Sequence, residues 1–523
     1  MTLFTGTKPR NTLKTVMPLW VALVVATVGG LLLRTSFPAP AIWPFAFLGL
    51  ALILLALRGR SFWAGLLVGL FAGGALWGSL IFWLTLYLGP IPWLALCALM
   101  ALWVGLSGGA IALVYKWTAK TTSPWIEFGA VPVIVGAIWA ARETLAASWP
   151  YGGFSWARLA YSQAESPFSH VVSWIGVAGL SFAVAVVSSL AVAILVNPRR
   201  RPMYVWGALT LALVLIPVFP SSVSGTTRVL VAQGNSKAGL FDAQNPGQVL
   251  SDHVSATLAA ADDPLATSVD MIVWPENGSD IDPLRSEDAA RVIDAVATKF
   301  AAPVVTGTIT NPIGETYFNS SIVWTPGEGV TAQYDKKRPV PFAEYMPNRA
   351  FFRALVPDLV DLVSRDYSFG TRPNVVDVNG VEAGISICFD ITDNALTREM
   401  VAGGAQIILA QTNNADFGTT DENLQQLAIA RLAAIESART VVNDSTVGTT
   451  AIIRADGSTQ AQLTPYAPGY LIADVDLSET VTPAMVAGSF IEVLVVGLSL
   501  AGLIGLGVNS RIGRGGARKL RSR

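Results

Sequence analysis

The chain has 523 residues, of which 52% are hydrophobic and only 14% charged, and its formal net charge is -1. This composition is typical of an integral membrane protein, and the near balance of charge argues against nucleic acid as a partner. The long uncharged runs lie before about residue 221 and after about residue 483, whereas the residues between them have the mixed texture of a soluble domain. We therefore expect a membrane part and a soluble part in one chain.

Eight apolar runs approach the length of about 20 residues that a helix needs to cross a bilayer. The first run follows a basic segment, as in a signal peptide, but further runs follow it directly, so we predict a retained helix. The fifth contains Arg142 and Glu143, which at membrane depth must face protein or water. The runs are 17–33, 41–57, 62–87, 91–115, 130–148, 169–196, 204–220 and 484–508.

Basic residues predict how these spans are oriented. Lysine and arginine gather at the N-terminus, in alternate connections and in the C-terminal tail, so with eight spans they all fall on one side. The positive-inside rule then places both termini in the cytoplasm. We predict four parts: a transmembrane domain of about seven helices (1–220), an extracytoplasmic domain (221–483), a C-terminal transmembrane helix (484–508) and a basic cytoplasmic tail (509–523).

The soluble part alternates short runs rich in Val and Ile with helical patterns, which indicates an α/β domain with layered sheets. We predict strands at 228–233, 270–274, 302–306, 320–324, 329–334, 384–388 and 406–410. We predict helices at 245–262, 286–300, 391–403 and 421–440.

Cys388 is one of two cysteines in the chain, and the other, Cys97, lies in an apolar run. We therefore expect a free thiol at Cys388. A small buried hydrophobe is one interpretation of such a residue. A reactive thiol is the other, and it is favoured by the predicted outward-facing location, where paired cysteines are the rule.

Three predicted strand ends carry residues that can act together in catalysis. Glu276 follows 270–274, Lys336 follows 329–334, and Cys388 ends 384–388. Each also has a purely structural explanation: Glu276 as a loop cap, Lys336 as a solvated charge in a turn, and Cys388 as a core residue. Together they supply a general base in Glu276, an oxyanion-stabilising cation in Lys336 and a nucleophile in Cys388.

The surroundings of Cys388 favour a reactive thiol. A nearby cation or a helix N-terminus lowers the pKa of a thiol, and we expect both Lys336 and the helix predicted after Asp390 to do so. The two histidines, His170 and His253, lie in no motif, so the sequence gives little support to a mechanism that pairs a cysteine with a histidine. Neither metal-ligand spacing nor a phosphate-binding glycine loop is evident, so we expect no metal and no cofactor.

These three residues and their flanks resemble the nitrilase superfamily, whose Glu-Lys-Cys triad occupies such positions. The sharpest matches are WPEN at 274–277, YDKKRPVPFAEYMP at 334–347 and SICFD at 386–390. With membrane parts on both sides, the chain resembles the apolipoprotein N-acyltransferases. The resemblance implies an α-β-β-α sandwich for 221–483, identifies Lys336 rather than Lys337 as the triad lysine, and implies a bacterial cytoplasmic (inner) membrane protein.

The chain departs from the family pattern near the triad. Phe389 and Asp390 stand where Tyr-Glu is usual, Asp416 stands where an aromatic is common, and Phe241 is the aromatic nearest to a family tryptophan. Glu344 matches a family glutamate, and we expect it either to orient Lys336 or the incoming amine or to form a loop salt bridge. We take Glu344, Phe389 and Asp390 as supporting residues.

The resemblance implies a two-step acyl exchange. Cys388 takes an acyl group from a phospholipid as a thioester, and the α-amine of the diacylglyceryl-cysteine at the N-terminus of an apolipoprotein then takes it from the enzyme. The partners would be the phospholipid, this lipoprotein and the bilayer. Two alternatives stay open: a membrane-tethered amidase of the same superfamily, in which water replaces the amine, and a non-catalytic membrane scaffold.

The segment 342–372 is rich in Phe and Leu and is too long and apolar for an idle connection. It either packs against the soluble domain or forms an arm that touches the membrane and admits lipid. Removal of its apolar side chains should, in the second case, impair lipid use more than folding.

Overall fold

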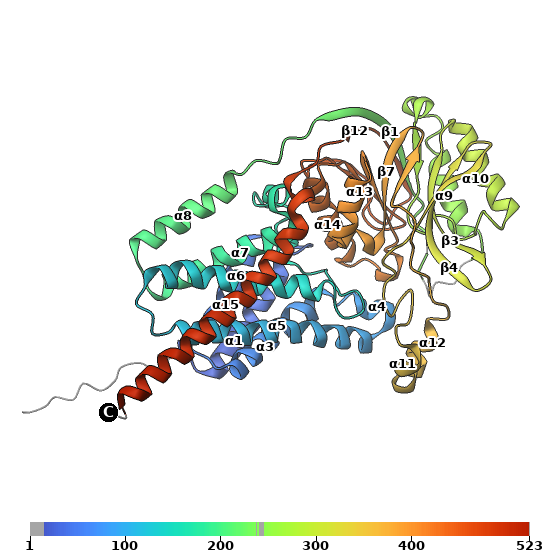
Figure 1. Cartoon of the computed structure of the whole chain (residues 1–523). Helices are drawn as coiled ribbons and strands as arrows, with labels where there is room; N and C mark the ends of the chain where they lie inside the picture. The colour runs from blue at the N-terminus through green and yellow to red at the C-terminus, as the bar shows by residue number, and fades with distance from the viewer. Residues whose placement is uncertain (1–14, 237, 240–244, 522–523) are drawn as a thin grey trace, which may run out of the picture.

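The computed structural model describes residues 15–236, 238–239 and 245–521. A bundle of apolar helices forms one side of the molecule, and a two-sheet sandwich forms the other (Figure 1). The helices of the bundle are α1 (Leu19–Thr35), α2 (Pro44–Leu57), α3 (Phe62–Leu80), α4 (Leu84–Leu88), α5 (Pro90–Thr118), α6 (Val131–Ala146), α7 (Val172–Val196), α8 (Arg200–Leu215) and α15 (Pro483–Arg521).

Within the described residues, five helical segments are long and apolar enough to cross a membrane: Phe62–Leu80, Pro90–Thr118, Ile126–Ala146, Ser169–Val196 and Pro483–Arg511. The helices α1 and α2 are apolar but shorter. The predicted run 62–87 is not one helix, because α3 ends at Leu80 and α4 follows as a separate helix of 5 residues. The third apolar run is therefore divided into two helices.

The bundle is packed through small residues where helices come closest. A Cβ placed on Gly69 of α3 would lie 2.5 Å from the carbonyl oxygen of Val104 in α5, so only glycine permits this approach. The charged pair in α6 is buried and faces protein, one of the two surroundings expected for it. Arg142 contacts the Glu143 carboxylate at 3.1 Å, and the Trp139 indole N–H donates to the same oxygen at 2.8 Å.

The soluble part contains two six-stranded sheets. The first has the order β12-β1-β2-β3-β4-β5 and the second the order β11-β10-β9-β8-β7-β6. The first comprises β1 (Val223–Gln233), β2 (Met271–Val273), β3 (Val304–Ile313), β4 (Thr316–Thr325), β5 (Gly329–Asp335) and β12 (Gly469–Ser478). The second comprises β6 (Val375–Val378), β7 (Val381–Ile387), β8 (Ile407–Thr412), β9 (Val441–Ser445), β10 (Ala451–Ile453) and β11 (Thr459–Gln462).

The sheets face each other across an aliphatic core, and helices cover their outer faces. Val231 and Val273 of the first sheet belong to the same buried cluster as Ile385 and Leu409 of the second. The helices α9 (Gln248–Leu258) and α10 (Glu287–Phe300) cover the first sheet, while α13 (Asn394–Ala402) and α14 (Glu422–Ser437) cover the second. This is the α-β-β-α sandwich predicted from the resemblance.

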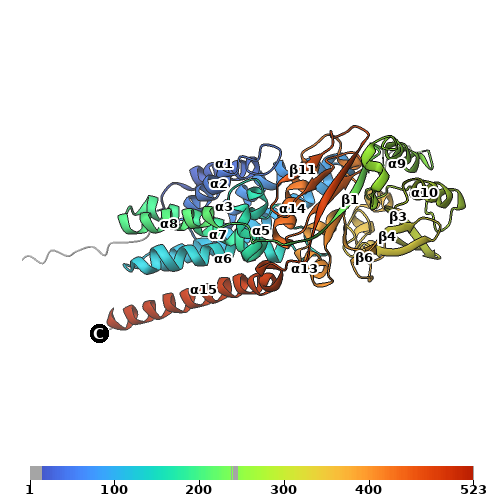
Figure 2. The same ribbon diagram turned by 90° about the horizontal axis from the view of Figure 1, so that it is seen from above.

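The helix α14 lies between the second sheet and the membrane bundle (Figure 2). Its apolar residues share one buried cluster with the bundle helices and with β8 and β9. The loop after α6 reaches the same region, where the Ser155 hydroxyl donates to the carbonyl oxygen of Thr392 at 3.1 Å. The bundle and the sandwich are therefore joined through a common core rather than through a flexible linker alone.

The apolar segment 342–372 forms two short helices, α11 (Arg349–Leu355) and α12 (Pro357–Leu362), that project from the sandwich (Figure 1). Its packing is divided, and contact of this segment with the membrane stays a prediction. Met346 and Val360 form a small buried cluster of their own, while Phe351 is 60% exposed and Leu355 is 62% exposed.

Candidate active site

Cys388 directly follows β7 and begins a 3-10 helix, η5 (Cys388–Thr392). Its φ is +49°, in the left-handed region that residues other than glycine rarely adopt. Such strain is kept only where the surrounding structure enforces it, and it occurs often at functional sites. The tight turn holds the half-buried thiol at the end of the strand.

Lys336 lies beyond β5 between two carboxylates. Its Nζ is 3.2 Å from Oε1 of Glu276 and 3.0 Å from Oε2 of Glu344. Lys336 is 1% exposed and Glu276 is 4% exposed, so the ion pairs are shielded from water. A buried pair that loses one partner leaves an uncompensated charge, so the three groups depend on one another.

Asn319 of β4 joins the same cluster, although the sequence analysis did not identify it. Its Nδ2 donates to Oε1 of Glu276 and to Oε1 of Glu344, each at 2.7 Å. The pairing of β4 with β5 in the hairpin indicates that Asn319 lies beside Lys336. One step beyond the pair Ser320 and Asp335, the Lys336 N–H donates to the Asn319 carbonyl oxygen at 2.8 Å, so the two residues are neighbours.

A glycine allows the loop that carries Glu276 to approach β3. A Cβ on Gly307 would lie 2.7 Å from the Cα of Glu276 and 2.6 Å from the backbone nitrogen of Asn277. The Gly307 N–H also donates to the Pro275 carbonyl oxygen at 3.1 Å. The backbone on both sides of Glu276 is therefore fixed against the sheet.

The electrostatics of Lys336 keep it charged. Burial alone would lower the pKa of its ammonium group, but the carboxylates of Glu276 and Glu344 outweigh burial and hold the pKa well above its ordinary value. A lysine that is always protonated suits the stabilisation of negative charge.

The expectation of a lowered thiol pKa at Cys388 is wrong. Burial, reinforced by the negative charge of Glu276, raises the pKa of this thiol well above its ordinary value, and the opposing effect of Lys336 is smaller. The physical reason is that the charge of Lys336 is already shared between two carboxylates. The resting residue is consequently a thiol, and it needs a base to remove its proton.

Asp390 connects the Cys388 turn to the Lys336 strand. Its Oδ2 accepts a hydrogen bond from the Tyr334 hydroxyl at 2.8 Å, and its Oδ1 accepts one from the Arg338 N–H at 3.0 Å. Burial raises the pKa of Asp390 to about 6, despite the opposing effects of Lys336 and these hydrogen bonds. Asp390 therefore links the Cys388 turn to the segment around Lys336 through hydrogen bonds.

Phe389 turns away from the charged cluster into a row of aromatic rings, the aromatic ladder: Phe389, Phe154, Trp156, Trp83 and Phe417. The Phe389 ring stacks on Phe154 with centroids 6.1 Å apart, and Phe154 stacks on Trp156 at 6.0 Å. Trp83 then contacts both Trp156, at 5.5 Å, and Phe417, at 4.9 Å. Three of the five rings belong to the membrane part.

The loop 413–418, which departs from the family pattern at Asp416, directly follows β8. Asn413 donates from Nδ2 to Oδ1 of Asn277 at 3.2 Å, so this loop reaches the residue after Glu276. Asp416 lies in the short helix η6 (Ala415–Phe417), which carries Phe417 into the aromatic ladder. Phe241 lies outside the described residues.

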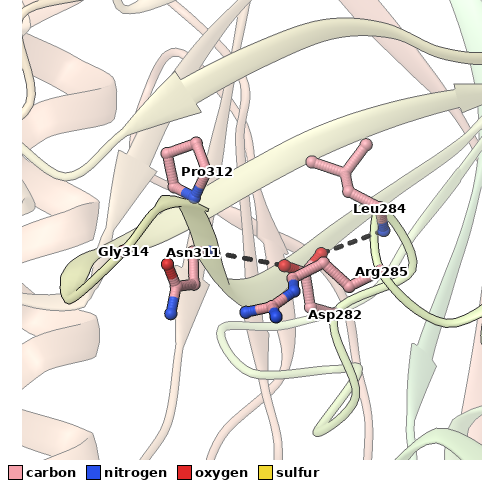
Figure 3. Close-up of a pocket in the computed structure, with 6 residues that line it drawn as sticks. All are labelled: Asp282, Leu284, Arg285, Asn311, Pro312 and Gly314. Carbon is pink, nitrogen blue, oxygen red and sulfur yellow. Dashed lines mark hydrogen bonds between the residues drawn. The ribbon is translucent and has the colours of Figure 1, made fainter.

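A pocket of about 450 Å³ lies beside the tip of the β3–β4 hairpin (Figure 3). The Asp282 carboxylate accepts hydrogen bonds there from the backbone N–H groups of Leu284, at 2.9 Å, and Asn311, at 3.3 Å. Its polar groups thus serve as loop caps. None of Glu276, Lys336 and Cys388 lines this pocket, so we do not place the chemistry there.

The histidines lie apart from the triad. His253 is fully buried in α9, where its Nδ1 donates to the Val249 carbonyl oxygen at 2.8 Å, and burial lowers its pKa to about 4. His170 lines a second cavity between the bundle and α14. Among the described residues, no group of three or more histidine, cysteine, aspartate and glutamate side chains is arranged to hold a metal ion.

Comparison with known proteins matches both parts of the chain. Residues 29–190 match the apolipoprotein N-acyltransferase N-terminal domain, and residues 229–482 match the carbon-nitrogen hydrolase domain. The apolipoprotein N-acyltransferase of Mycolicibacterium smegmatis is 33% identical over 92% of this chain and 84% of the relative. The chain belongs to the apolipoprotein N-acyltransferase family.

A second apolipoprotein N-acyltransferase, from Azotobacter vinelandii, is 28% identical over 89% of this chain and 91% of the relative. A solved nitrilase-superfamily amidase from Nesterenkonia covers 49% of this chain and 92% of its own, at 16% identity and a TM-score of 0.38. Membership of the apolipoprotein N-acyltransferase family makes the chain an acyltransferase and a bacterial membrane protein, with a nitrilase-type sandwich. It also removes the scaffold alternative.

Proposed function

We propose that the chain transfers an acyl group from a phospholipid to the N-terminal diacylglyceryl-cysteine of apolipoproteins, and that Glu276, Lys336 and Cys388 perform the chemistry. The buried arrangement of Lys336 between two carboxylates, within electrostatic reach of the Cys388 thiol, carries the proposal. It supplies a base, a permanent cation and a nucleophile in one water-poor site.

The first step forms a thioester. Glu276 removes the Cys388 proton, the sulfur forms a bond with the ester carbonyl carbon, and Lys336 stabilises the oxyanion of the tetrahedral intermediate. The ester C–O bond then breaks, and the proton held by Glu276 passes to the departing oxygen. The products are the acyl-enzyme and a lysophospholipid.

The second step transfers the acyl group to nitrogen. The neutral α-amine of the lipoprotein attacks the thioester carbonyl, and a new C–N bond forms while Glu276 takes an amine proton. The C–S bond breaks, its electron pair returns to sulfur, and the proton passes from Glu276 to Cys388. The enzyme is thereby regenerated without any cofactor.

The supporting residues have distinct proposed roles. Glu344 orients Lys336, a role that rests on the 3.0 Å contact between them and on the hydrogen bond from the Val340 N–H at 2.7 Å. Asp390 fixes the turn that presents Cys388. Phe389 and the aromatic ladder form the apolar wall that receives an acyl chain.

The proposed orientation in the membrane determines where the two substrates meet the sandwich. We place both termini in the cytoplasm and the sandwich, residues 221–483, outside it, with 1–220 and 484–508 as the transmembrane parts and 509–523 as a cytoplasmic tail. The distribution of lysine and arginine supports this orientation. The acyl donor and the lipid-modified acceptor would then meet at the outer surface of the bilayer.

The proposed function is tested with purified protein in phospholipid vesicles that contain a diacylglyceryl-modified lipoprotein. We expect the wild type to produce N-acylated lipoprotein and Cys388→Ala to produce none, with an unchanged thermal unfolding profile. Transfer retained by Cys388→Ala would contradict the mechanism. Release of free fatty acid, with no N-acylated product, would favour the hydrolase alternative, in which water replaces the amine.

A further inference from the structure

The side of Cys388 that faces α14 carries a hydrogen-bond donor that the two-step mechanism has not used. The side-chain Nε2 of Gln426 donates to the Cys388 Sγ at 3.7 Å, a normal separation for a hydrogen bond to sulfur. Gln426 is 2% exposed, so its amide is not turned toward water. It lies on the second turn of α14.

The orientation of the Gln426 amide is fixed by Asn414. The Nδ2 of Asn414 donates to Oε1 of Gln426 at 2.9 Å and to Oε2 of Glu422 at 2.7 Å. Its Oδ1 accepts from the hydroxyls of Ser445, at 2.6 Å, and Thr412, at 3.2 Å. Because Asn414 presents its N–H groups to Gln426, the glutamine must present its oxygen to Asn414 and its own N–H to the sulfur.

The space around Asn414 is closed on the remaining side. A Cβ on Gly448 would lie 2.7 Å from Oδ1 of Asn414, so this glycine lets the backbone pass directly over the amide. Asn414 and Gln426 are both buried at 2% exposure. The chain of amides from Asn414 to the sulfur is therefore preorganised before any substrate binds.

We propose that Gln426 is a further catalytic residue, which donates a hydrogen bond to the Cys388 sulfur whenever the sulfur carries negative charge. Asn414 is the positioning residue that orients the Gln426 amide. The inference rests on the proposed function for its place in the reaction. The thiolate forms when Glu276 takes the proton in the first step, and again when the C–S bond breaks in the second.

The charged groups around the thiol show why a neutral donor is needed. Among the described residues, the negative charges of Glu276 and Glu344 oppose ionisation of the Cys388 thiol, as does Glu422 once it has lost its proton, and the cation Lys336 favours it. Lys336 already serves two carboxylates. A hydrogen bond to the charged form of a group favours ionisation, so Gln426 offsets part of the effect of burial.

The inference is tested by the pH dependence of Cys388 alkylation with iodoacetamide, measured by peptide mass spectrometry on the full-length protein in detergent from about pH 7 to about pH 11. Gln426→Met keeps the length of the side chain without its donor. We expect it to raise the apparent pKa of Cys388 by about one unit and to slow alkylation about tenfold at a fixed pH below that pKa. Asn414→Ala should shift the profile in the same direction by a smaller amount.

Gln425→Leu is the matched control. It removes a buried glutamine amide from the neighbouring position of α14, where the amide oxygen accepts from the Trp83 and Trp156 indoles instead of facing the sulfur. We expect its alkylation profile to equal that of the wild type. Gln426→Leu serves as a second variant if Gln426→Met does not fold.

An unchanged alkylation profile in a folded Gln426 variant would overturn the inference, and so would an equal shift in Gln425→Leu. The assay contains neither acyl donor nor lipoprotein, so its result is separate from the proposed function. A shifted profile together with a wild type that transfers no acyl group would contradict the proposed function alone. An unshifted profile together with normal transfer would contradict the role of Gln426 alone.

Discussion

The two walls of the candidate site differ in charge and in origin. The charged wall consists of Glu276, Lys336, Glu344 and Asn319, which come from the first sheet and the loops that follow its strands. The neutral wall consists of amides from α14 and the loop before it, together with the aromatic ladder. Cys388 accepts a hydrogen bond from Gln426 of the neutral wall and is affected electrostatically by the charged wall.

This difference separates chemistry from substrate recognition. The charged wall is built within the sandwich and contains the groups that we propose to move protons and stabilise charge. The neutral wall includes Trp83, Phe154 and Trp156 from the membrane part, so it exists only because the bundle and the sandwich share a core. We infer that the sandwich supplies the reaction and that the membrane part adapts it to lipid.

The largest effect in the charged wall is expected for Glu276→Gln. The variant keeps the shape of the side chain but cannot accept a proton, so acyl transfer should fall by about 10²–10⁴-fold. The measurement is the initial rate of lipoprotein N-acylation in vesicles. Glu287→Gln, on the first turn of α10, is the control and should keep the wild-type rate. A rate near that of the wild type for Glu276→Gln would contradict the proposed role of Glu276 as the general base.

Lys336→Met should have a somewhat smaller effect on the reaction and a larger one on folding. Loss of the oxyanion donor should slow transfer by about 10²–10³-fold. Two carboxylates that have lost their common cation should also reduce the free energy of unfolding by about 3–5 kcal/mol. Transfer rates and thermal unfolding, measured on the same preparation, separate the two effects. Unchanged stability would show that the cluster is not held by this lysine.

In the neutral wall, Phe389→Leu should impair lipid use without changing the thiol. Loss of the stack on Phe154 removes about 0.5–1.5 kcal/mol, so transfer should fall by roughly two- to tenfold. The alkylation profile of Cys388 should stay that of the wild type. Phe219→Leu, which loses a ring contact with Trp174 elsewhere in the chain, is the control. A fall as large as that for Glu276→Gln would contradict the division between the walls.

Glu422→Gln tests whether the neutral wall is neutral. Burial raises the pKa of Glu422 to about 8, so the carboxyl is protonated at neutral pH. Because the pKa of Glu422 is higher in the folded state than in the unfolded state, its proton stabilises the fold. This stabilisation is complete below the ordinary pKa of a glutamate and is lost as the pH rises through about 8. The wild type should therefore lose stability relative to Glu422→Gln as the pH is raised. Parallel curves of Tm against pH would show that Glu422 does not titrate there.

Seven of the twelve strands in the described residues could be predicted from Val- and Ile-rich runs that lie between turn residues. Of the missed strands only β11 lacks such residues, whereas β6, β9, β10 and β12 are also rich in Val, Ile or Leu. The sequence of β11 is TQAQ, and β9 directly follows a helix that was predicted to extend to residue 440, whereas α14 ends at Ser437. The strand β11 is therefore formed by pairing with β10 rather than by its own composition.

The residues proposed to react could be identified from motifs at strand ends, but their electrostatics could not. The pKa of Cys388 depends on burial and on how Lys336 divides its charge, and both require the folded structure. Asn319 and Gln426 escaped notice because they lie inside a strand and a helix. Only the spatial arrangement shows that their amides point at reactive groups.

The central claim is that Cys388 carries the acyl group between donor and acceptor. It is tested most directly by the intact mass of the protein after incubation with phospholipid and without lipoprotein. We expect a mass increase equal to one acyl group, located on the peptide that contains Cys388 and removed by hydroxylamine, and no such adduct on Cys388→Ala. Transfer to lipoprotein in the absence of any hydroxylamine-sensitive adduct on the wild type would contradict the thioester mechanism.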